Sequence, residues 1–299
     1  MAESPLVSVI TPSYNTGRFI EETILSIKNQ TYPHIEHIIM DGGSTDETLD
    51  IIRKYEGTYD MRWVSEPDKG QSDAINKGWR MAKGGILCWL NSDDSYLPDA
   101  VTTAVKYLEE HQDAVMVYGE CNIIDECSTV TGRCQAKPFS FRKMLCRGNV
   151  VPQPASFWRR VVLERVGELD TGLHYVMDFD YWLRIALEYQ IAYVPKYLAN
   201  FRHCPGTKSI SQSAKFAHDQ LYVLDKLFAI PELPDKVKKL KSCAYGMVHF
   251  KIGAGYYAQR QMGQAREHLF KAIGLNPGII TESYIIPYLL LSFFRGRGG

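Results

Sequence analysis

The sequence lacks the cysteine spacing of a metal site or of a redox site. Its seven cysteines include no Cys-x-x-Cys pair, and an odd number at irregular spacing does not indicate a disulfide framework. A chain of 299 residues buries well over half of its unfolded surface, so it can fold without covalent cross-links. We therefore expect free, reduced thiols.

Long apolar runs are also missing. The longest candidate, residues 279–294, is interrupted by Glu282 and Pro287, so no membrane span is expected. The first residues, MAESPLVSVITPSYN, lack a basic segment followed by a long apolar core. This start predicts no signal peptide and a cytoplasmic location.

The chain has no net charge, with 34 basic and 34 acidic residues, and no nucleic-acid partner is expected. Residues 1–230 nevertheless carry 24 basic and 30 acidic side chains, whereas residues 231–299 carry 10 basic and 4 acidic. An acidic front half suits metal binding and a basic tail suits an anionic partner, although two solvated faces of opposite sign would give the same counts. With 23% charged and 12% aromatic residues, the composition excludes disorder.

Short apolar runs alternate with helical periods in the first 120 residues. The runs LVSVI, IEHIIM, MRWVS, ILCWL and AVMVY are typical of buried strands. Strand–helix alternation indicates βαβ crossovers and a mostly parallel sheet, which binds ligands at the carboxyl ends of its strands. Four of these ends are rich in Asp, Asn and Gly: residues 11–15, 41–46, 66–70 and 91–94.

Asp93 and Asp94 are the sharpest chemical signal. Two adjacent carboxylates after the apolar run ILCWL repel each other unless a cation or protons lie between them. Oxygen ligands select Mg²⁺ or Mn²⁺, which often carry substrate phosphates. The alternative is an Asp-rich turn before a helix that starts near Pro98.

Other polar residues admit both structural and functional interpretations. Ser44-x-x-Glu47 is a capping box, yet Asp41 just before it can accept a hydrogen bond from a nucleobase or a ribose. Asp178 and Asp180 stand near the start of a predicted helix at about 178–189. One of the two is expected to be an ordinary cap, and the other can act as a general base.

Five motifs in order then identify a family. SVITPSYN, IIMDGGSTDET, SEPDKGQSDAINKG, ILCWLNSDD and MDFDYWLR resemble glycosyltransferase family 2 over residues 6–205. This family is inverting and has the α/β GT-A fold, a mostly parallel sheet flanked by helices. The segment around QPASFWRR is most similar to bacterial members that build surface polysaccharides.

The resemblance implies a function and a set of roles. A GT-A catalytic domain would span residues 1–230 and transfer a sugar from a nucleotide-diphosphate donor, with UDP favoured, to a glycan or lipid-linked hydroxyl. Asp178 would be the catalytic base, and Mn²⁺ or Mg²⁺ would be held by Asp94, Asp93 and His203. The residues implied in donor binding are Thr11, Pro12, Tyr14, Asn15, Asp41, Asp68, Gly70, Asp73, Ser92 and Asp93.

Two positions depart from the family pattern. The family often has Asp-Asp-Gly-Ser where this chain has Asp41-Gly42-Gly43-Ser44, so one polar contact is missing. Met177 replaces the Glu that often precedes the base.

Rival functions lack their own motifs. A sugar-phosphate nucleotidyltransferase needs a Gly-rich basic loop after the first strand, and a dinucleotide enzyme needs G-x-G-x-x-G; neither is present. A catalytically inactive adaptor that binds proteins through its tail stays open as an alternative.

The tail, residues 231–299, is expected to be a helical extension. With Pro277 as position 32, its sequence follows the tetratricopeptide pattern at Gly253, Tyr256, Ala265, Leu269 and Ala272. We expect one such hairpin at about 246–277, with a plain helical hairpin as the alternative, and then an apolar terminal helix. Lysines at 236–241 and the terminal IIPYLLLSFFRGRGG would suit peripheral contact with an anionic membrane or a protein partner.

Overall fold

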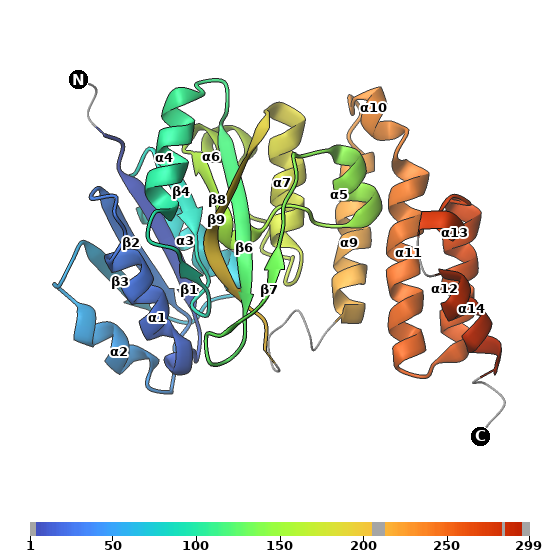
Figure 1. The fold of residues 1–299 in the computed structure, drawn as a ribbon, viewed down its shortest axis with the longest axis horizontal. Helices are drawn as coiled ribbons and strands as arrows, with labels where there is room; N and C mark the ends of the chain where they lie inside the picture. Colours follow the sequence, from blue (N-terminus) through green and yellow to red (C-terminus); the bar gives the residue numbers. More distant parts are fainter. Residues whose placement is uncertain (1–3, 205–212, 283–284, 295–299) are drawn as a thin grey trace. The chain divides into compact units, whose positions relative to one another are not determined.

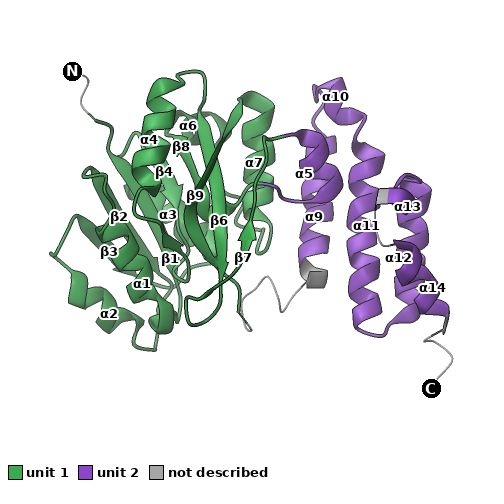
Figure 2. Cartoon of the chain, in the orientation of Figure 1, with its two compact units in different colours: residues 1–139, 151–204 green, residues 140–150, 205–299 purple. Residues whose placement is uncertain are grey.

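The computed structural model describes residues 4–204, 213–282 and 285–294. The chain forms two compact units (Figure 2). The first comprises residues 1–139 and 151–204, and the second comprises residues 140–150 and 205–299. The expected boundary at residue 230 lies inside the second unit, just after helix α9 (Ser213–Phe228), because that helix packs with the helical tail.

A single mixed sheet forms the centre of the first unit (Figure 1). Four parallel strands lie in the order β3-β2-β1-β4, and the sheet continues through β8, β6, β9 and β5, with β7 paired to β6. Antiparallel pairs join β4 to β8, β8 to β6 and β9 to β5. The bounds are β1 Val7–Ser13, β2 Ile35–Asp41, β3 Met61–Ser65, β4 Ile86–Trp89, β5 Ser95–Tyr96, β6 Met116–Ile124, β7 Val130–Cys134, β8 Ser156–Arg159 and β9 Ile191–Arg202.

Helices cover both faces of this sheet (Figure 1). Helices α1 (Gly17–Lys28) and α2 (Thr48–Tyr55) pack over the face that carries Ile39. Helix α3 (Gln71–Met81) packs over the opposite face, where Gly78 lies against Ile10 and Met40. The remaining helices of this unit are α4 (Ala100–Glu110), the 3₁₀ turn η1 (Gln153–Ala155), α6 (Val161–Val166) and α7 (Met177–Glu188).

A cluster of buried aromatic rings joins these layers. The cluster comprises Trp79 of α3, Trp89 of β4, Trp158 of β8 and Tyr181 and Trp182 of α7, and the centroids of contacting rings lie 5.3–6.4 Å apart. All five side chains are almost fully buried. Since large aromatic side chains dominate the energetics of a core, this cluster fixes the strand end that follows Trp89.

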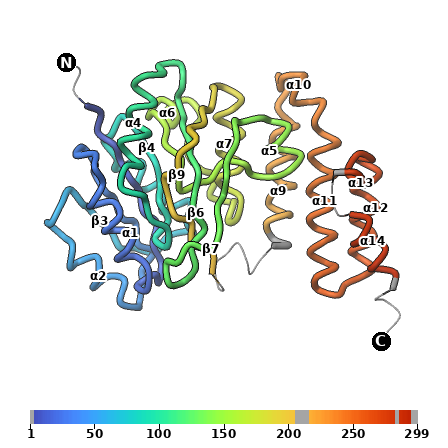
Figure 3. The backbone as a smooth tube through the Cα atoms, in the orientation of Figure 1, coloured from blue at the N-terminus to red at the C-terminus, as the bar shows by residue number. Residues whose placement is uncertain are grey.

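The second unit is helical. Its helices are α5 (Phe141–Arg147), α9, α10 (Asp235–Lys238), α11 (Lys241–Ala258), α12 (Met262–Leu275), α13 (Ile279–Glu282) and α14 (Ile285–Phe294). Helices α11 and α12 lie side by side (Figure 3) and approach closely at Gly253, where a Cβ atom would stand 2.9 Å from Cγ of Leu269. The expected hairpin is therefore helical, and the buried Ala265, Leu269 and Ala272 face its interior; its assignment as a tetratricopeptide repeat stays a prediction.

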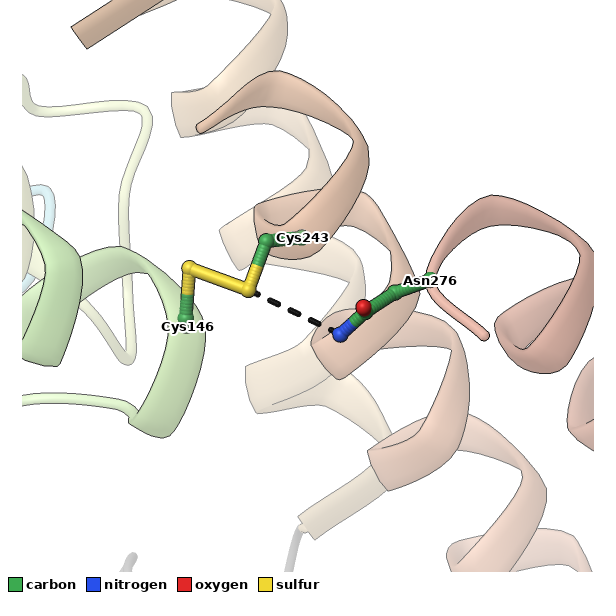
Figure 4. Close-up of a disulfide and its surroundings, with 3 residues drawn as sticks. All are labelled: Cys146, Cys243 and Asn276. Atoms are coloured by element: carbon green, nitrogen blue, oxygen red, sulfur yellow. Dashed lines mark hydrogen bonds between the residues drawn. A yellow bond between two sulfur atoms is a disulfide. The ribbon is translucent and has the colours of Figure 1, made fainter. Parts of the chain in front are cut away.

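One disulfide corrects the expectation of free thiols throughout. Cys146 of α5 is bonded to Cys243 of α11, with the two Cα atoms 5.4 Å apart (Figure 4). Asn276 donates a hydrogen bond to Sγ of Cys243. The pair spans 97 residues of sequence, and it forms because α5, although it lies between β7 and β8 in the sequence, packs on α11 of the helical unit.

Within residues 4–204, 213–282 and 285–294, we find no helix with the length and apolar character needed to cross a bilayer.

Candidate functional site

Asp94 is the most constrained carboxylate at the carboxyl edge of the parallel strands. It is 1% exposed. Its Oδ1 accepts a hydrogen bond from the backbone N–H of Arg202 at 2.9 Å, and Oδ2 accepts one from Nδ2 of Asn91 at 3.2 Å. Its backbone carbonyl accepts a hydrogen bond from Oγ1 of Thr23. Burial, followed by the charge of Asp93, raises the pKa of Asp94 well above its ordinary value because both disfavour the ionised form.

Arg202 at the end of β9 holds this corner together, and sequence reasoning did not single it out. Its side chain is 1% exposed. Nε donates to the carbonyl of Asp93 at 2.9 Å, Nη1 donates to the carbonyl of Asp125, and Nη2 donates to Glu22 and Ser128. An arginine inside the strand-like run YLANFRH was the available signal, since a buried guanidinium must find acceptors.

Asn91 connects the same corner to two other loops. Its Oδ1 accepts a hydrogen bond from Nε2 of Gln71 at 2.7 Å, and its Nδ2 donates to Oε1 of Gln153 at 3.1 Å. Gln153 in turn donates to the carbonyl of Trp89. This polar network fixes the start of α3 and the turn η1 relative to Asp94.

The donor atoms at this corner fit a divalent ion that is shared with a substrate. Asp94 is buried, and Asp93 beside it is half-buried. Among the described residues, no group of three or more His, Cys, Asp or Glu side chains is arranged to hold a metal ion. Carboxylate oxygens are ligands that Mg²⁺ prefers, and this ion is often bound by one or two carboxylates together with substrate phosphates.

His203 does not join the two aspartates in such a group. Its side chain is exposed, and its backbone N–H donates to the carbonyl of Ile124. Ser92 precedes the pair and is buried.

Asp41 lies at the end of β2 and is buried, with its carboxylate occupied by its own loop. Oδ2 accepts hydrogen bonds from the N–H groups of Gly43 and Ser44 and from Oγ of Ser65, while Oδ1 accepts one from Oγ of Ser44. The residue therefore shapes the turn after β2, and base binding by Asp41 stays a prediction.

The segment after β1 is fastened to that turn. The N–H of Asn15 donates to Oγ of Ser44, and Oδ1 of Asn15 accepts from the N–H of Thr45. Asn15 has a positive φ of 50°, which Asn tolerates better than most residues. Tyr14, the residue before Asn15, is 62% exposed, so its side chain faces solvent at the strand ends.

Thr11 and Pro12 lie inside β1 and are buried. Oγ1 of Thr11 is 2.9 Å from Nε2 of His37. Burial lowers the pKa of His37 to about 3, so this imidazole stays neutral at physiological pH.

The loop between β3 and α3 and the first turn of α3 carry two further carboxylates, Asp68 and Asp73. Oδ1 of Asp68 accepts a hydrogen bond from the N–H of Gly70 at 2.7 Å, and Oδ2 of Asp73 accepts one from the N–H of Lys69 at 3.1 Å. Gly70 has a φ of 114°, a conformation that only glycine adopts without strain.

Asp178 lies in the first turn of α7 and is half-buried. The chain just before it runs along α3, since Oγ of Ser72 donates to the carbonyl of Leu173. A Cβ atom on Gly70 would stand 3.4 Å from Nδ1 of His174. The start of α7 therefore lies close to the loop that carries Asp68.

Asp180 is the structural member of the pair. It is buried, and its Oδ2 accepts a hydrogen bond from Nε of Arg184 at 2.8 Å. Arg184 also donates to the carbonyls of Val166 and Glu168, so this carboxylate anchors α7 and Asp178 is left as the candidate base.

Sequence comparisons place the chain in a family. The sequence model "Glycosyl transferase family 2" matches residues 8–159. An uncharacterized glycosyltransferase of Mycobacterium tuberculosis is 35% identical over 190 residues, covering 62% of this chain and 71% of that protein. A putative teichuronic acid biosynthesis glycosyltransferase of Bacillus subtilis is 39% identical over 117 residues, covering 38% and 46%. The chain belongs to glycosyltransferase family 2.

Solved structures show the same fold. Residues 1–349 of TarS from S. aureus, in complex with UDP-GlcNAc, match with a TM-score of 0.70 at 17% identity, covering 96% of this chain and 89% of that one. The mannosyltransferase PcManGT from Pyrobaculum calidifontis, in complex with GDP-Man and Mn²⁺, matches with a TM-score of 0.65 at 21% identity, covering 99% and 85%. The first unit thus has the GT-A fold that the sequence motifs implied.

Proposed function

We propose that this protein is a metal-dependent, inverting glycosyltransferase that moves a hexose from a nucleoside-diphosphate donor to a hydroxyl group. The observation that carries the proposal is the carboxyl edge of the sheet. There, hydrogen bonds join Asp94 to Arg202, to Asn91 and through Asn91 to Gln71 at the start of α3. The ends of β1, β2 and β3 are joined to one another by Asn15–Ser44 and Ser65–Asp41. Ligands of open α/β sheets bind at this edge.

A divalent ion, Mn²⁺ or Mg²⁺, would be held by Asp94 with Asp93. When bound, it supplies charge neutralisation for the leaving diphosphate. The protein's own groups hold these two residues: Nε of Arg202 donates to the backbone carbonyl of Asp93, and the carboxylate of Asp94 accepts from the backbone N–H of Arg202 and from Nδ2 of Asn91. Because the structure shows no ring of three protein ligands among the described residues, the diphosphate oxygens would complete the coordination.

Asp178 would take the proton from the acceptor hydroxyl. It is half-buried at the start of α7, and the N–H of Phe179 donates to its Oδ1. The acceptor oxygen then attacks the anomeric carbon on the face opposite the leaving diphosphate, the carbon–oxygen bond to that diphosphate breaks, and the configuration inverts. A positioned base contributes about 10²–10⁴-fold to such a rate.

Relatives suggest the substrates. TarS binds UDP-GlcNAc and PcManGT binds GDP-Man, so the donor is a nucleotide sugar, with UDP favoured. The relative from Bacillus subtilis has a name in teichuronic acid biosynthesis, which supports an acceptor in cell-surface polysaccharide synthesis, either a glycan or a lipid-linked glycan.

The exposed apolar face of the last helix supports a peripheral contact of the protein with the cytoplasmic side of a membrane. Helix α14 has no charged residue, and its Ile286, Leu290, Leu291 and Phe293 are 38–55% exposed. Together with the basic excess of residues 231–299, this face suits an anionic lipid surface where lipid-linked acceptors lie. Flotation with anionic and neutral vesicles tests the contact: binding is expected only to the anionic ones at low salt, and no binding to either refutes it.

Thermal unfolding with UDP, GDP and dTDP, each with and without Mn²⁺, tests the catalytic proposal. A ligand at about 100 times its Kd adds roughly 2.7 kcal/mol of stability, or several degrees. We expect a metal-dependent shift with one nucleotide that is lost in Asp94→Ala and kept in Asp50→Ala, whose side chain is 82% exposed on α2. No shift with any nucleotide would refute the proposal and favour the inactive adaptor.

A further inference from the structure

An ion pair with a buried arginine lies behind the backbone of the two aspartates. Nη2 of Arg202 donates to Oε2 of Glu22 at 2.6 Å. Glu22 belongs to α1 and Arg202 ends β9, so the pair joins elements that are 180 residues apart in the sequence. The guanidinium also lies over the ring of Phe19, 4.6 Å from its centroid. Because a buried cation needs acceptors and a counter-charge, these contacts account for the presence of an arginine at this depth.

Arg202 contacts both aspartates, each in a different way. Its Nε donates to the backbone carbonyl of Asp93 at 2.9 Å, so it holds the peptide group that joins the two residues. Its backbone N–H donates to Oδ1 of Asp94 at 2.9 Å, so it holds the carboxylate. A guanidinium presents several donors in one rigid plane, and here a second nitrogen donates to the carbonyl of Asp125. A lysine ammonium is a single point of charge and does not replace this set.

Glu22 receives donors on both of its carboxylate oxygens. Oε2 accepts from Arg202 and from Oγ of Ser128 at 2.5 Å, and Oε1 accepts from Oγ of Ser95 at 3.1 Å. Ser95 directly follows Asp94 in the sequence. The carboxylate of Glu22 therefore holds the guanidinium in place from α1 and also balances its charge.

The charge of an isolated Arg202 would oppose a cation at Asp93 and Asp94, because like charges in a poorly hydrated site repel each other strongly. Glu22 cancels this charge from 2.6 Å. The hydrogen bonds that orient the aspartates are kept. The pair thus contributes geometry to the corner and little net charge.

We infer that Arg202 and Glu22 are positioning residues of the cation site. This inference rests on the proposed function. Arg202 orients the two aspartates through its hydrogen bonds, and Glu22 neutralises Arg202 so that a divalent ion can bind nearby. Neither residue is assigned a contact with the ion or with the substrate. Partners of metal ligands change metal affinity by about tenfold to a hundredfold when they are removed.

Titration of the full-length protein with Mn²⁺, alone and with UDP, GDP or dTDP present, tests this assignment when free Mn²⁺ is followed by electron paramagnetic resonance. In Arg202→Met the affinity for Mn²⁺ should fall by about tenfold to a hundredfold, although the change removes a positive charge. A purely electrostatic role of Arg202 would instead make Mn²⁺ bind more tightly. Arg202→Lys keeps the charge without the donor geometry, so it should lose affinity as well.

Glu22→Gln tests the neutralising part. The amide oxygen can still accept the hydrogen bond from Arg202, but the guanidinium keeps its full charge, so the affinity for Mn²⁺ should fall by about tenfold. Nucleotide affinity without metal, measured by calorimetry, should stay at the wild-type value in all three variants. A general loss of structure would lower both affinities.

Arg184→Met is the matched control. Arg184 has the same donor pattern as Arg202, with one carboxylate, that of Asp180, and two backbone carbonyls, but it lies on α7. This change should lower the free energy of unfolding in urea and keep the affinity for Mn²⁺.

The signs of the changes separate the outcomes. Wild-type affinity for Mn²⁺ in folded Arg202→Lys and Glu22→Gln, or tighter binding in Arg202→Met, would overturn the inference while leaving metal binding by the wild type intact. The two milder variants carry the test if Arg202→Met does not fold. A folded wild type that binds no Mn²⁺ with any of the three nucleotides would instead overturn the proposed function.

Discussion

Replacing Asp94 by Asn should stabilise the protein without ligand and abolish its response to ligand. The carboxylate is 1% exposed, and its nearest charged neighbour on the same loop is another carboxylate, Asp93. The guanidinium of Arg202 donates to carbonyls, Glu22 and Ser128, while only its backbone N–H reaches Asp94. The ionised form of this carboxylate is therefore disfavoured in the ligand-free protein, and a bound cation would offset that cost.

The contacts set the size of the effect. Burying an ion costs several kcal/mol of desolvation free energy. The Asn variant avoids this cost and keeps the hydrogen bond from the N–H of Arg202. Its new amide N–H group faces Nδ2 of Asn91, so one hydrogen bond of about 1 kcal/mol is lost. We expect the free energy of unfolding of the Asn variant to be about 1–3 kcal/mol higher than that of the wild type. Each kcal/mol raises the melting temperature by about 2–4 °C.

Thermal and urea unfolding at pH 7, with and without Mn²⁺ and the preferred nucleotide, measure both parts of this prediction. The variant should melt above the wild type without ligand and below it at saturating ligand, since only the wild type gains the binding energy. Asp180→Asn is the matched control. Because the carboxylate of Asp180 pairs with Arg184 at 2.8 Å, this change should lower the melting temperature both without and with ligand. The rise in melting temperature on adding ligand should be kept. A lower melting temperature for ligand-free Asp94→Asn would refute the reasoning.

Three further results are expected. Asp178→Asn should lower kcat by about 10²–10⁴-fold with nucleotide affinity unchanged, as measured by sugar transfer and calorimetry; a rate within twofold of wild type would contradict its role as base. Ellman titration of the unfolded protein should count five free thiols before reduction and seven after it; seven at once would exclude the disulfide. In urea unfolding, Gly253→Ala should destabilise because its Cβ would crowd Leu269 at 2.9 Å, whereas Gly255→Ala, with open space around it, should stabilise by about 0.5–1 kcal/mol. Equal effects of these two changes would refute the close helix contact.

The parallel part of the sheet could be predicted from the sequence because the residue patterns that indicate its strands are local. Four apolar runs became β1 to β4 within a few residues of their expected bounds. The helix expected at 178–189 is α7, Met177–Glu188. Periodicity and turn residues act over short stretches of chain, so a single sequence contains them.

The antiparallel part of the sheet was harder to predict from the sequence. The segment around QPASFWRR contributed to the family resemblance, but no strand was predicted for it. It forms η1 and then β8, which is inserted between β4 and β6. Gly132 lies inside β7, although glycine is depleted in strands. Burial of Phe157 and Trp158 against neighbours far along the chain overrides local propensity in such strands.

The candidate site shows the same division between local and distant information. The strand ends that carry Tyr14, Asp41, Asp68 and Asp94 were predictable, because parallel strands bring their carboxyl ends to one edge. Their partners were not. Arg202 donates to the carbonyl of Asp93 across 109 residues of sequence, and no spacing rule connects the two.

This separation has a consequence for how the site forms. Asp94 is held by Thr23 from α1 and by the backbone of Arg202 from β9, so the corner is complete only when the first helix and the last strand of the GT-A unit are both in place. The position of a carboxylate that is costly to bury thus depends on elements that lie far apart in the sequence. The packing of the aromatic core around Trp89 supports the strand end that precedes the two aspartates. Under the proposed function it would hold them in place for a cation and a diphosphate, which is the preorganisation that electrostatic catalysis requires.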